Sequence, residues 1–437
     1  MRAVEIIRKK RDGEPLSTEE IGWFVQQYTA DEIPDYQAAA FCMAVYLNGM
    51  SRQETVDFTL AVAESGDQLY LHDVIPMSVD KHSSGGVGDK TSLVVLPLVA
   101  ACGVPVAKMS GRGLGFSGGT LDKMEAISGW SPEMTIEQFK TQVEQISLVL
   151  AGQSADLAPA DGKLYALRDV TATVSSIPLI ACSIMSKKLA AGADAIVLDV
   201  KVGSGAFMKT VEEARELAQL MVQIGKDAGR ETVAVLSDMN QPLGHAVGNA
   251  LEVQEAIATL RGDEDIPADF WTHCATIAGH MLILAGQADT LTGANVLLHQ
   301  ARNSGRALAK FRAMVTAQGG DGSQVDQPNI LPQAPFIQEV YAPREGYIAA
   351  IDTAGVGLAA MRLGAGRAKK GDLIDPAVGV TMPVKIGDQL MEGDLLCTVH
   401  ARTEEALTAA ISELQATISW SDKAVTPPPH FHGTITA

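Results

Sequence analysis

The spacing of apolar and polar residues divides this chain into stretches that predict different secondary structure. Up to about residue 66, apolar positions recur at helical spacing behind Ser/Thr-x-x-Glu motifs. In such a motif the hydroxyl accepts from an early helical amide while the Glu side chain reaches back. The pattern predicts a small all-helical unit. The motifs pair Ser17 with Glu20, Thr29 with Glu32, and Ser51 with Glu54.

Between about residues 73 and 210, short apolar runs alternate with glycine-rich loops and helical patterns, and the clearest strand candidate is Ala-Ile-Val-Leu-Asp-Val at 195–200. Strands that alternate with helices favour a mostly parallel sheet covered by helices. From 211 to 320 the pattern is helical again, with apolar residues three and four apart in 212–225 and 252–261.

The stretch Gly-Gly-Asp-Gly-Ser at 319–323 interrupts the helical pattern as a linker, and short β segments with Gly-Asp turns follow Pro343. One of these turns is expected at 369–372. The sequence therefore predicts an α/β fold with a small all-α domain, a mixed, mostly parallel central sheet flanked by helices, and a β-rich α+β C-terminal domain. The expected domains are residues 1–66, 73–320 and 335–437.

Charge and cysteine content narrow the function classes. Lys and Arg number 34 against 52 Asp and Glu, a net charge of −18, so a nucleic-acid partner is not expected, although a small anion in a cationic pocket is still permitted. The five scattered cysteines indicate buried thiols in a reducing compartment. No apolar run reaches the roughly 18 residues of a membrane span. We expect a cytoplasmic protein without membrane contact.

Residues 80–92, Asp-Lys-His-Ser-Ser-Gly-Gly-Val-Gly-Asp-Lys-Thr-Ser, precede an apolar run with helical character. A glycine-rich loop that opens a helix lets backbone N–H groups approach an anion, and the helix N-terminus adds positive potential. The loop is not Walker A, because no Gly immediately precedes Lys90, and it does not complete GxGxxG. It has the character of a phosphate loop; a glycine turn with a solvated lysine is the alternative.

Two further sets carry candidate chemistry. Residues 108–125 place hydroxyls and cations among five glycines, which suits a second wall for the same anion; a flexible surface loop is the alternative. The third set is Arg168, Ser183 and Lys187. Ser183 and Lys187 are four residues apart and share one face if their segment is helical.

The run 110–125, together with Lys-His-Ser at 81–83 and Gly-Gly-Val-Gly-Asp at 85–89, resembles the signature and phosphate loop of the thymidine and pyrimidine-nucleoside phosphorylases. The resemblance covers essentially the whole chain. It implies a small α domain and a larger α/β domain separated by a cleft, with part of 160–190 returning to pack on the small domain. It also implies a homodimer, formed through the helical domain.

The resemblance implies reversible phosphorolysis of pyrimidine nucleosides (uridine, thymidine and deoxyuridine) in nucleoside salvage. Phosphate attacks C1′ with inversion, and the products are the free base and an α-pentose 1-phosphate. No cofactor is implied, and phosphate is the co-substrate. Carried over residue by residue, the phosphate ligands are Lys81, Ser83, Ser92, Lys108, Ser110 and Thr120, and the base ligands are Arg168, Ser183 and Lys187.

The expected catalytic residues are His82, Arg168 and Lys187. The departing base gains negative charge, so donors at its carbonyls stabilise the transition state more than the substrate; Arg168 and Lys187 are suited to this. His82 is suited to donate a proton to the base O2, because imidazole titrates near neutral pH. A hydrogen bond without proton transfer is the alternative for His82.

Two positions depart from the family pattern. Phe116 stands where the family usually has His, so any polar contact of that imidazole is absent. Lys90 stands where potassium-binding relatives usually have Thr. Our hypothesis is that the Lys90 ammonium takes the place of the cation and pairs with Glu255. By the family pattern the remaining potassium ligands fall at Gly88, Leu243, Ala246 and Glu255.

Three alternatives remain at this point. Thymidine-restricted relatives usually carry Met at the position of Lys108, so Lys predicts that uridine is also used; a thymidine-restricted enzyme is the alternative. An anthranilate-type phosphoribosyltransferase would need magnesium-binding carboxylates, and no Asp-Glu pair stands beside these loops. A lipoyl- or biotin-like carrier would modify Lys385, which is expected instead to be a solvated turn residue.

Overall fold

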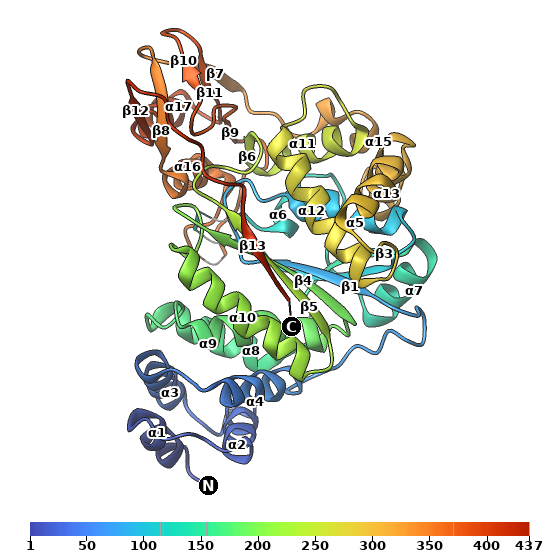
Figure 1. The fold of residues 1–437 in the computed structure, drawn as a ribbon, viewed down its shortest axis with the longest axis vertical. Coiled ribbons are helices and arrows are strands. Elements are labelled where there is room, and N and C mark those ends of the chain that lie inside the picture. Colours follow the sequence, from blue (N-terminus) through green and yellow to red (C-terminus); the bar gives the residue numbers. More distant parts are fainter. Residues whose placement is uncertain (114, 117, 154–155, 370, 437) are drawn as a thin grey trace.

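The computed structural model describes residues 1–113, 115–116, 118–153, 156–369 and 371–436. Leu114 and Ser117 of the second glycine-rich run, and Lys370 of the turn expected at 369–372, lie outside these residues. The chain builds a helical unit at the N-terminus, a central α/β unit and a β-rich unit at the opposite end (Figure 1). This arrangement confirms the expected fold class. None of the described helices has the length and apolar character needed to cross a membrane.

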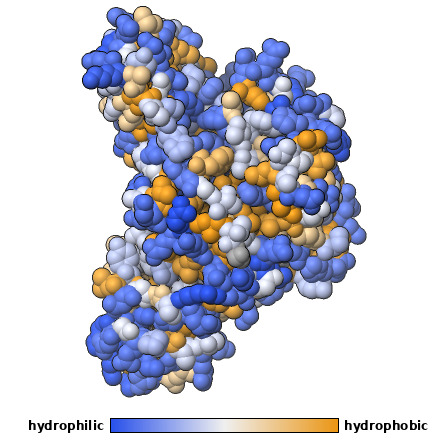
Figure 2. Space-filling model, viewed as in Figure 1, coloured by the Kyte–Doolittle hydropathy of each residue, from blue (hydrophilic) through white to orange (hydrophobic). Residues whose placement is uncertain are grey.

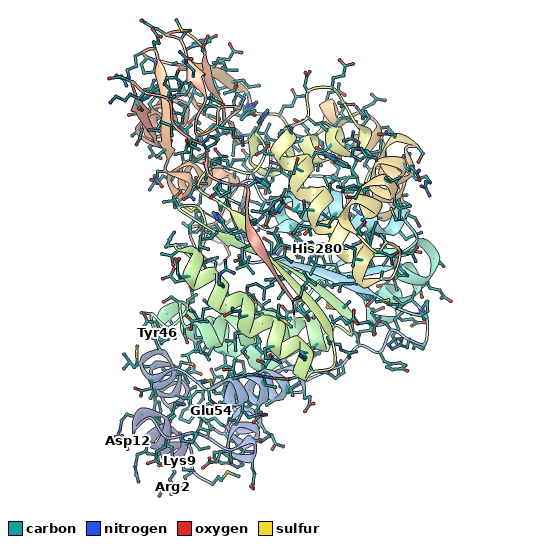
Figure 3. The ribbon with its side chains drawn as sticks, viewed as in Figure 1. Arg2, Lys9, Asp12, Tyr46, Glu54 and His280 are labelled. Carbon is teal, nitrogen blue, oxygen red and sulfur yellow. The ribbon has the colours of Figure 1, made fainter. Side chains whose placement is uncertain are left out.

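The helical unit combines four N-terminal helices with two that come later in the chain. Apolar side chains of both sets, including Phe24, Phe41 and Leu164, share one buried core. Ser17 and Ser51 form the expected capping boxes. The buried Lys10–Glu54 ion pair (2.8 Å) joins the first and fourth helices; Glu54 is labelled in Figure 3. The helices are α1 (Ala3–Arg11), α2 (Thr18–Thr29), α3 (Asp35–Asn48), α4 (Arg52–Ala63), α8 (Pro159–Val170) and α9 (Ile177–Ala190).

The helix start expected at Thr29 is wrong. Thr29 is the last residue of α2, and its hydroxyl donates back to the carbonyl of Val25 at 2.7 Å. The next helix begins only at Asp35, after Asp31 has taken a positive φ of 63° and Pro34 has fixed an extended backbone. A proline at the helix N-terminus sets the boundary more strongly than a Ser/Thr-x-x-Glu pattern, because its ring restricts the backbone directly.

The central unit is built on parallel strands. In the larger sheet the order is β1-β4-β5-β13, with β1, β4 and β5 parallel and β13 antiparallel, and a smaller sheet pairs β2 with β3 in parallel. All eight residues of β4 are buried, as expected for a sheet covered on both faces. The strands are β1 (Val79–Ser83), β2 (Val106–Ser110), β3 (Leu148–Gly152), β4 (Ala195–Val202), β5 (Glu231–Asp238) and β13 (Phe431–Thr436).

Helices cover both faces of this sheet (Figure 1). The amphipathic patterns at 212–225 and 252–261 both form helices, α10 and α11, as predicted. The space-filling view shows a mostly hydrophilic exterior over α10 (Figure 2). The helices are α5 (Thr91–Ala101), α6 (Thr120–Met124), α7 (Ile136–Ile146), α10 (Val211–Asp227), α11 (Asn249–Arg261), α12 (Ala268–Leu284), α13 (Leu291–Asn303), α14 (Arg306–Ala317), α15 (Ser323–Asp326) and the 3-10 turn η1 (Pro328–Ile330).

The C-terminal unit holds two small antiparallel sheets, β6-β9-β11-β7 and β10-β8-β12. Its boundary differs from the expected 335–437, because β13 leaves this unit and pairs with β5 of the central sheet (Figure 1). The elements are β6 (Ala246–Val247), β7 (Phe336–Tyr341), β8 (Gly346–Ile351), α16 (Thr353–Ala360), η2 (Met361–Ala365), β9 (Gly379–Thr381), β10 (Gln389–Leu390), β11 (Leu395–Ala401), α17 (Glu404–Ala416) and β12 (Ile418–Ser421).

Candidate active site at the carboxyl ends of the parallel strands

The two glycine-rich runs meet because each follows a parallel strand. Lys81, His82 and Ser83 end β1, and Lys108 to Ser110 end β2. Carboxyl ends of neighbouring parallel strands share one edge, where ligands of α/β proteins usually bind. The Lys108 ammonium donates to the carbonyl of Lys81 across this edge. The two runs predicted to form walls around one anion therefore lie side by side.

Lys81 has a buried ammonium without a matching carboxylate. Its side chain is 1% exposed, and its Nζ donates to Ser92 Oγ at 3.4 Å. Within the described part of the chain no carboxylate lies within ion-pair distance of it. Ser92 lies in the first turn of α5, whose N-terminus directs positive potential to the same point. A buried charge is retained only where something compensates it, so this position is suited to an anionic ligand.

The loop between β1 and α5 is fixed by its own polar groups. Ser83 Oγ donates to Asp89 and accepts from the backbone N–H of Gly85 at 3.2 Å. Burial alone would raise the pKa of Asp89, but the charges of Lys81, Lys201 and Lys123 and the Ser83 hydroxyl hold it well below its usual value. Asp89 is therefore ionised and orders the loop. The two remaining predicted phosphate ligands lie close by in the fold: Ser110 ends β2, and Thr120 opens α6.

His82 lies among four lysines. Burial lowers the pKa of its imidazole well below the usual value, and the charges of Lys188, Lys108, Lys187 and Lys81 lower it further. The ring is therefore neutral at neutral pH, and protonated only in acid. A neutral imidazole still has one N–H donor. The lowered pKa favours a hydrogen bond from the neutral His82 ring over the transfer of a proton from imidazolium.

Replacing His82 with Ala is expected to lower kcat about 10-fold to 100-fold, the loss that one hydrogen bond to a charged group produces, and to raise the phosphate KM less. Steady-state kinetics with both substrates varied checks this. If imidazolium is the donor instead, the wild-type kcat falls as pH rises through the lowered pKa of His82. A phosphate KM that rises more than kcat falls would remove His82 from the chemical step.

The third set of residues lies on two helices that reach this edge from the helical unit. Ser183 and Lys187 share a face of α9, as predicted, and Lys187 Nζ contacts Ser183 Oγ (2.9 Å) and Asp161 (2.6 Å). Arg168, at the end of α8, donates through Nε, Nη1 and Nη2 to the carbonyls of Thr173, Leu179 and Val174. Three of its five N–H groups are thus used by the backbone, and two remain for a ligand.

Sequence reasoning missed two groups that organise this edge. Lys188 Nζ bridges the carboxylate of Asp80 (2.7 Å) and the carbonyl of Met109 (3.1 Å), which ties α9 to β1 and β2. Burial raises the pKa of Asp80, but Lys108 and Lys188 outweigh burial and keep the carboxyl ionised. The sequence offered one signal for both groups: a second lysine, Lys188, directly follows Lys187, and an acidic residue, Asp80, directly precedes Lys81.

Burial lowers the pKa of Lys108 to about 7. The Asp80 carboxylate opposes this shift, and the charges of Lys188 and Lys81 offset part of the effect of Asp80. Its ammonium is therefore lost as pH rises above about 7. We predict that the phosphate KM increases by up to about tenfold per pH unit above that point, because the cationic form binds the anion. Kinetics of the wild type and Lys108→Met from pH 6 to 9 test this. The ionisation of phosphate itself affects the wild type and Lys108→Met equally. An identical dependence of the phosphate KM on pH in the two proteins would therefore contradict the prediction.

The ammonium of Lys90 occupies the position where the family pattern places a potassium ion. Its side chain is fully buried, and its Nζ contacts Glu255 and the carbonyls of Leu243 (2.6 Å) and Ala246 (3.2 Å). The Glu255 carboxylate also accepts the backbone N–H groups of His245 (2.8 Å) and Ala246 (3.0 Å). The ammonium lies among the groups that would ligate potassium, so the residues present do not fit an additional ion.

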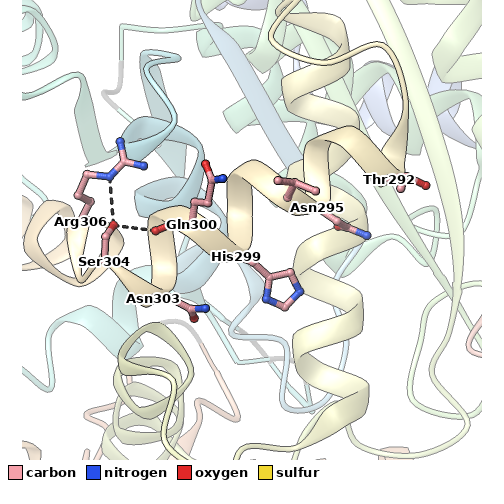
Figure 4. Close-up of a pocket in the computed structure, with 8 residues that line it drawn as sticks. Thr292, Asn295, His299, Gln300, Asn303, Ser304 and Arg306 are labelled. Carbon is pink, nitrogen blue, oxygen red and sulfur yellow. Dashed lines mark hydrogen bonds between the residues drawn. The ribbon is translucent and has the colours of Figure 1, made fainter.

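An open groove on the surface lies away from this site. It is an open depression of about 820 Å³ along α13, lined by side chains such as His299 and Arg306 (Figure 4). The Arg306 guanidinium donates to Ser304, which donates in turn to the carbonyl of Gln300. None of the residues assigned above lines this groove, so it has no part in the candidate site.

Lys385 is not the solvated turn residue expected from the sequence. Its ammonium donates to the carbonyls of Pro242 (2.7 Å) and Gly244 (2.6 Å) and pairs with Asp269 (2.9 Å). These contacts join the C-terminal unit to the central unit and leave the side chain 18% exposed. A lysine held in this way is not presented for attachment of a lipoyl or biotin group.

A helical unit and a parallel α/β unit, with buried lysines at the strand ends, are the architecture on which the family comparison places this chain among the glycosyltransferases. The family described as "Glycosyl transferase family, a/b domain" matches residues 76–308, and its helical bundle domain matches 4–66. Residues 347–421 match the family described as "Pyrimidine nucleoside phosphorylase C-terminal domain".

Known proteins agree with these matches. Pyrimidine-nucleoside phosphorylases of two Staphylococcus aureus strains are each 52% identical over 427 residues, which cover 98% of both chains. The chain belongs to the pyrimidine-nucleoside phosphorylase family and is an enzyme of the pentosyltransferase class. Anthranilate phosphoribosyltransferase from Thermus thermophilus has a similar fold, with a TM-score of 0.59 at 21% identity, over 73% of this chain and 99% of that one.

Proposed function

We propose that this enzyme catalyses the reversible phosphorolysis of uridine, thymidine and deoxyuridine to the free base and an α-pentose 1-phosphate, as a cytoplasmic step of nucleoside salvage. Membership of the family supports the reaction. The single observation that carries the site is the buried ammonium of Lys81, which has Ser92 and the N-terminus of α5 beside it and no carboxylate partner in the described part of the chain.

The geometry suggests how the two substrates are handled. Phosphate binds at the ends of β1 and β2, where Lys81, Lys108 and the two glycine-rich runs converge. The base lies toward α8 and α9, where Lys187 and the two free N–H groups of Arg168 stabilise the negative charge that develops as the glycosidic bond breaks. His82 lies between these groups and donates a hydrogen bond to the base. Protein donors thus act at both ends of the bond that is cleaved.

The test is the release of free base from uridine, thymidine and deoxyuridine, with and without phosphate, followed by base absorbance. We expect cleavage that requires phosphate, with all three nucleosides used. Cleavage of thymidine and deoxyuridine without uridine would establish a thymidine-type enzyme and discard the inference from Lys108. Release of base without phosphate would contradict phosphorolysis.

The fold shared with anthranilate phosphoribosyltransferase raises phosphoribosyl transfer as a second candidate reaction. That fold alone does not favour it, because the two proteins are only 21% identical. The acidic residues at this edge, Asp80, Asp89 and Asp161, are each engaged by lysine or serine groups and are poorly placed to bind magnesium. We expect no turnover of phosphoribosyl pyrophosphate in the presence of magnesium.

We further propose that the enzyme works without potassium. The Lys90 ammonium, held by Glu255 and the carbonyls of Leu243 and Ala246, supports this. Initial rates in potassium, sodium and choline chlorides at equal ionic strength are expected to agree. A steep increase in rate with potassium over sodium would overturn the proposal.

We propose in addition that two copies associate through the outer face of α1, α3 and α8. Each of these helices carries exposed apolar side chains: Val4 (40%) on α1, Tyr36 (75%) and Leu47 (72%) on α3, and Val170 (79%) on α8. Tyr46 lies on the same outer edge (Figure 3), where apolar side chains reach the surface in the space-filling view (Figure 2). Exposed apolar side chains gathered on adjoining helices often mark a protein interface.

Replacing Leu47 with Arg on this face is expected to convert a dimer of 46.0 kDa chains into monomers, because a charge would be buried at a symmetric contact, twice per dimer. Light scattering behind size exclusion measures the mass. The control is Leu373→Arg, a change at a residue of the C-terminal unit that is 97% exposed and lies away from the proposed face. A monomeric wild type, or equal masses for both variants, would contradict the proposed interface.

A further inference from the structure

The C-terminal unit reaches into the second glycine-rich run through Arg367. The backbone carbonyl of Arg367 accepts the N–H of Gly115 at 3.0 Å, and its Nη1 donates to Asp122 Oδ1 at 2.8 Å. Its Nε donates to the carbonyl of Asp372 at 3.1 Å, which fixes the guanidinium within its own unit. One residue of the β-rich unit therefore bonds both the backbone of the run and the acid that follows it.

Asp122 is the point where these contacts meet. Its side chain is 4% exposed and lies two residues after Thr120, one of the proposed phosphate ligands. Oδ2 accepts the backbone N–H of Gly113 at 2.7 Å, and Oδ1 also faces Arg112 Nη1 at 3.3 Å. The carboxylate thus holds both ends of the glycine-rich run together. A side chain at Gly119 would lie 2.6 Å from Asp122 Oδ2, so the backbone wraps closely around the carboxylate.

Phe116 adds an apolar contact to the same unit. A Cβ at Gly357 of α16 would lie 2.6 Å from the carbonyl of Phe116 and 3.0 Å from its Cβ, so the two backbones are closely apposed. The Phe116 ring lies 5.7 Å from that of Phe207, and Lys209 Nζ lies 5.9 Å from its centre. At the position where relatives present an imidazole, this chain presents an aromatic ring packed between two units.

We infer that Arg367 and Asp122 are positioning residues for phosphate: through them the C-terminal unit sets the glycine-rich run that carries Ser110 and Thr120. The inference rests on the proposed phosphorolysis. Since a small displacement of a binding group can weaken its contribution about 100-fold, loss of this ion pair affects phosphate more than nucleoside. Arg367 touches neither substrate in this assignment and acts only through Asp122 and the backbone.

The test compares Arg367→Ala with Arg362→Ala. Arg362 is five residues earlier in the same segment and forms an exposed ion pair with Glu413 (2.8 Å) inside the C-terminal unit, so it controls for loss of a charge there. We expect Arg367→Ala to raise the phosphate KM about 10-fold to 100-fold, with the nucleoside KM changed less than threefold, on the order of 0.6 kcal/mol, and Arg362→Ala to leave both unchanged. Arg367→Lys, which keeps the charge, is expected to restore part of the phosphate affinity.

A double variant separates positioning from general damage. Asp122→Asn combined with Arg367→Ala is expected to be no worse than the more affected single variant, because both changes break the same contact. Equal phosphate KM for Arg367→Ala and Arg362→Ala, or equal increases in both substrate KM values, would overturn the inference. Absence of phosphate-dependent turnover in the wild type would instead reject the proposed function, so the two failures are distinguishable.

Discussion

Replacing Lys81 with Met is expected to lower kcat/KM for phosphate by about 10²-fold to 10³-fold, the typical effect of removing one charged donor from a preorganised anion site. The side chain of Lys81 is 1% exposed, and Ser92 is the partner of its ammonium. Lys81 also lowers the pKa of Asp89, but among the described residues no carboxylate lies within ion-pair distance of its ammonium, which leaves the charge available to an anion. Met preserves most of the side-chain volume, so the loss is one of charge.

The same substitution is expected to leave the stability of the protein unchanged or to raise it, because an uncompensated buried ammonium opposes folding. Phosphate should raise the melting temperature of the wild type and not that of Lys81→Met, since a ligand stabilises the state that binds it. The control is Lys140→Met, which removes an exposed ammonium paired with Asp73 and should behave as wild type in both measurements. Phosphate stabilisation that survives in Lys81→Met would contradict the role of Lys81.

Replacing Lys90 with Thr is expected to lower the free energy of unfolding by about 3–5 kcal/mol in sodium or choline chloride, because Glu255 is left buried without its partner. The loss should be reversed in part by potassium. The substitution vacates a place bordered by the Glu255 carboxylate and the carbonyls of Leu243 and Ala246, all oxygen groups suited to a hard cation. Denaturant unfolding in the three salts at equal ionic strength measures the effect.

The matched control for this experiment is Lys10→Thr. It breaks another well-buried ion pair, Lys10 with Glu54, in which both side chains are 4% exposed. Its expected loss of stability is similar, but potassium should not restore it, since among the described residues the Lys10 ammonium donates to Glu54 and to no backbone carbonyl. Equal responses of Lys90→Thr to potassium and sodium would mean that Lys90 is a structural lysine and does not substitute for a cation.

The glycine-rich runs and the elements around them were predictable because their signals are local. The capping boxes at Ser17 and Ser51, the strand at 195–200 and the amphipathic helices at 212–225 and 252–261 each depend on residues within a few positions of one another. The helix start expected at Thr29 failed for a local reason as well: Pro34 restricts the backbone more strongly than the pairing of a hydroxyl with a nearby Glu can favour a start.

Long-range partners were harder to predict. Lys188 and Asp80 lie on different elements and meet only because α9 lies against the ends of β1 and β2. The contacts of Arg367 with Asp122, and of Lys385 with Pro242 and Gly244, cross from one unit to another. The return of β13 to β5 follows from an open sheet edge, which the preceding sequence does not mark.

The sequence by itself determined the fold class through helix and strand periodicity, and the family through the resemblance of its glycine-rich motifs. It also supplied the residue types of the proposed anion site, because such motifs are read from neighbouring positions. Only the tertiary structure decided which charges are paired. It left the buried ammonium of Lys81 without a carboxylate at ion-pair distance among the described residues, and it paired Glu255 with Lys90. It also buried His82 among lysines, and burial first and the lysine charges second lower the pKa of its ring. The physical reason is that a charge interacts through space with groups from distant parts of the chain, and its burial depends on the packing of the whole.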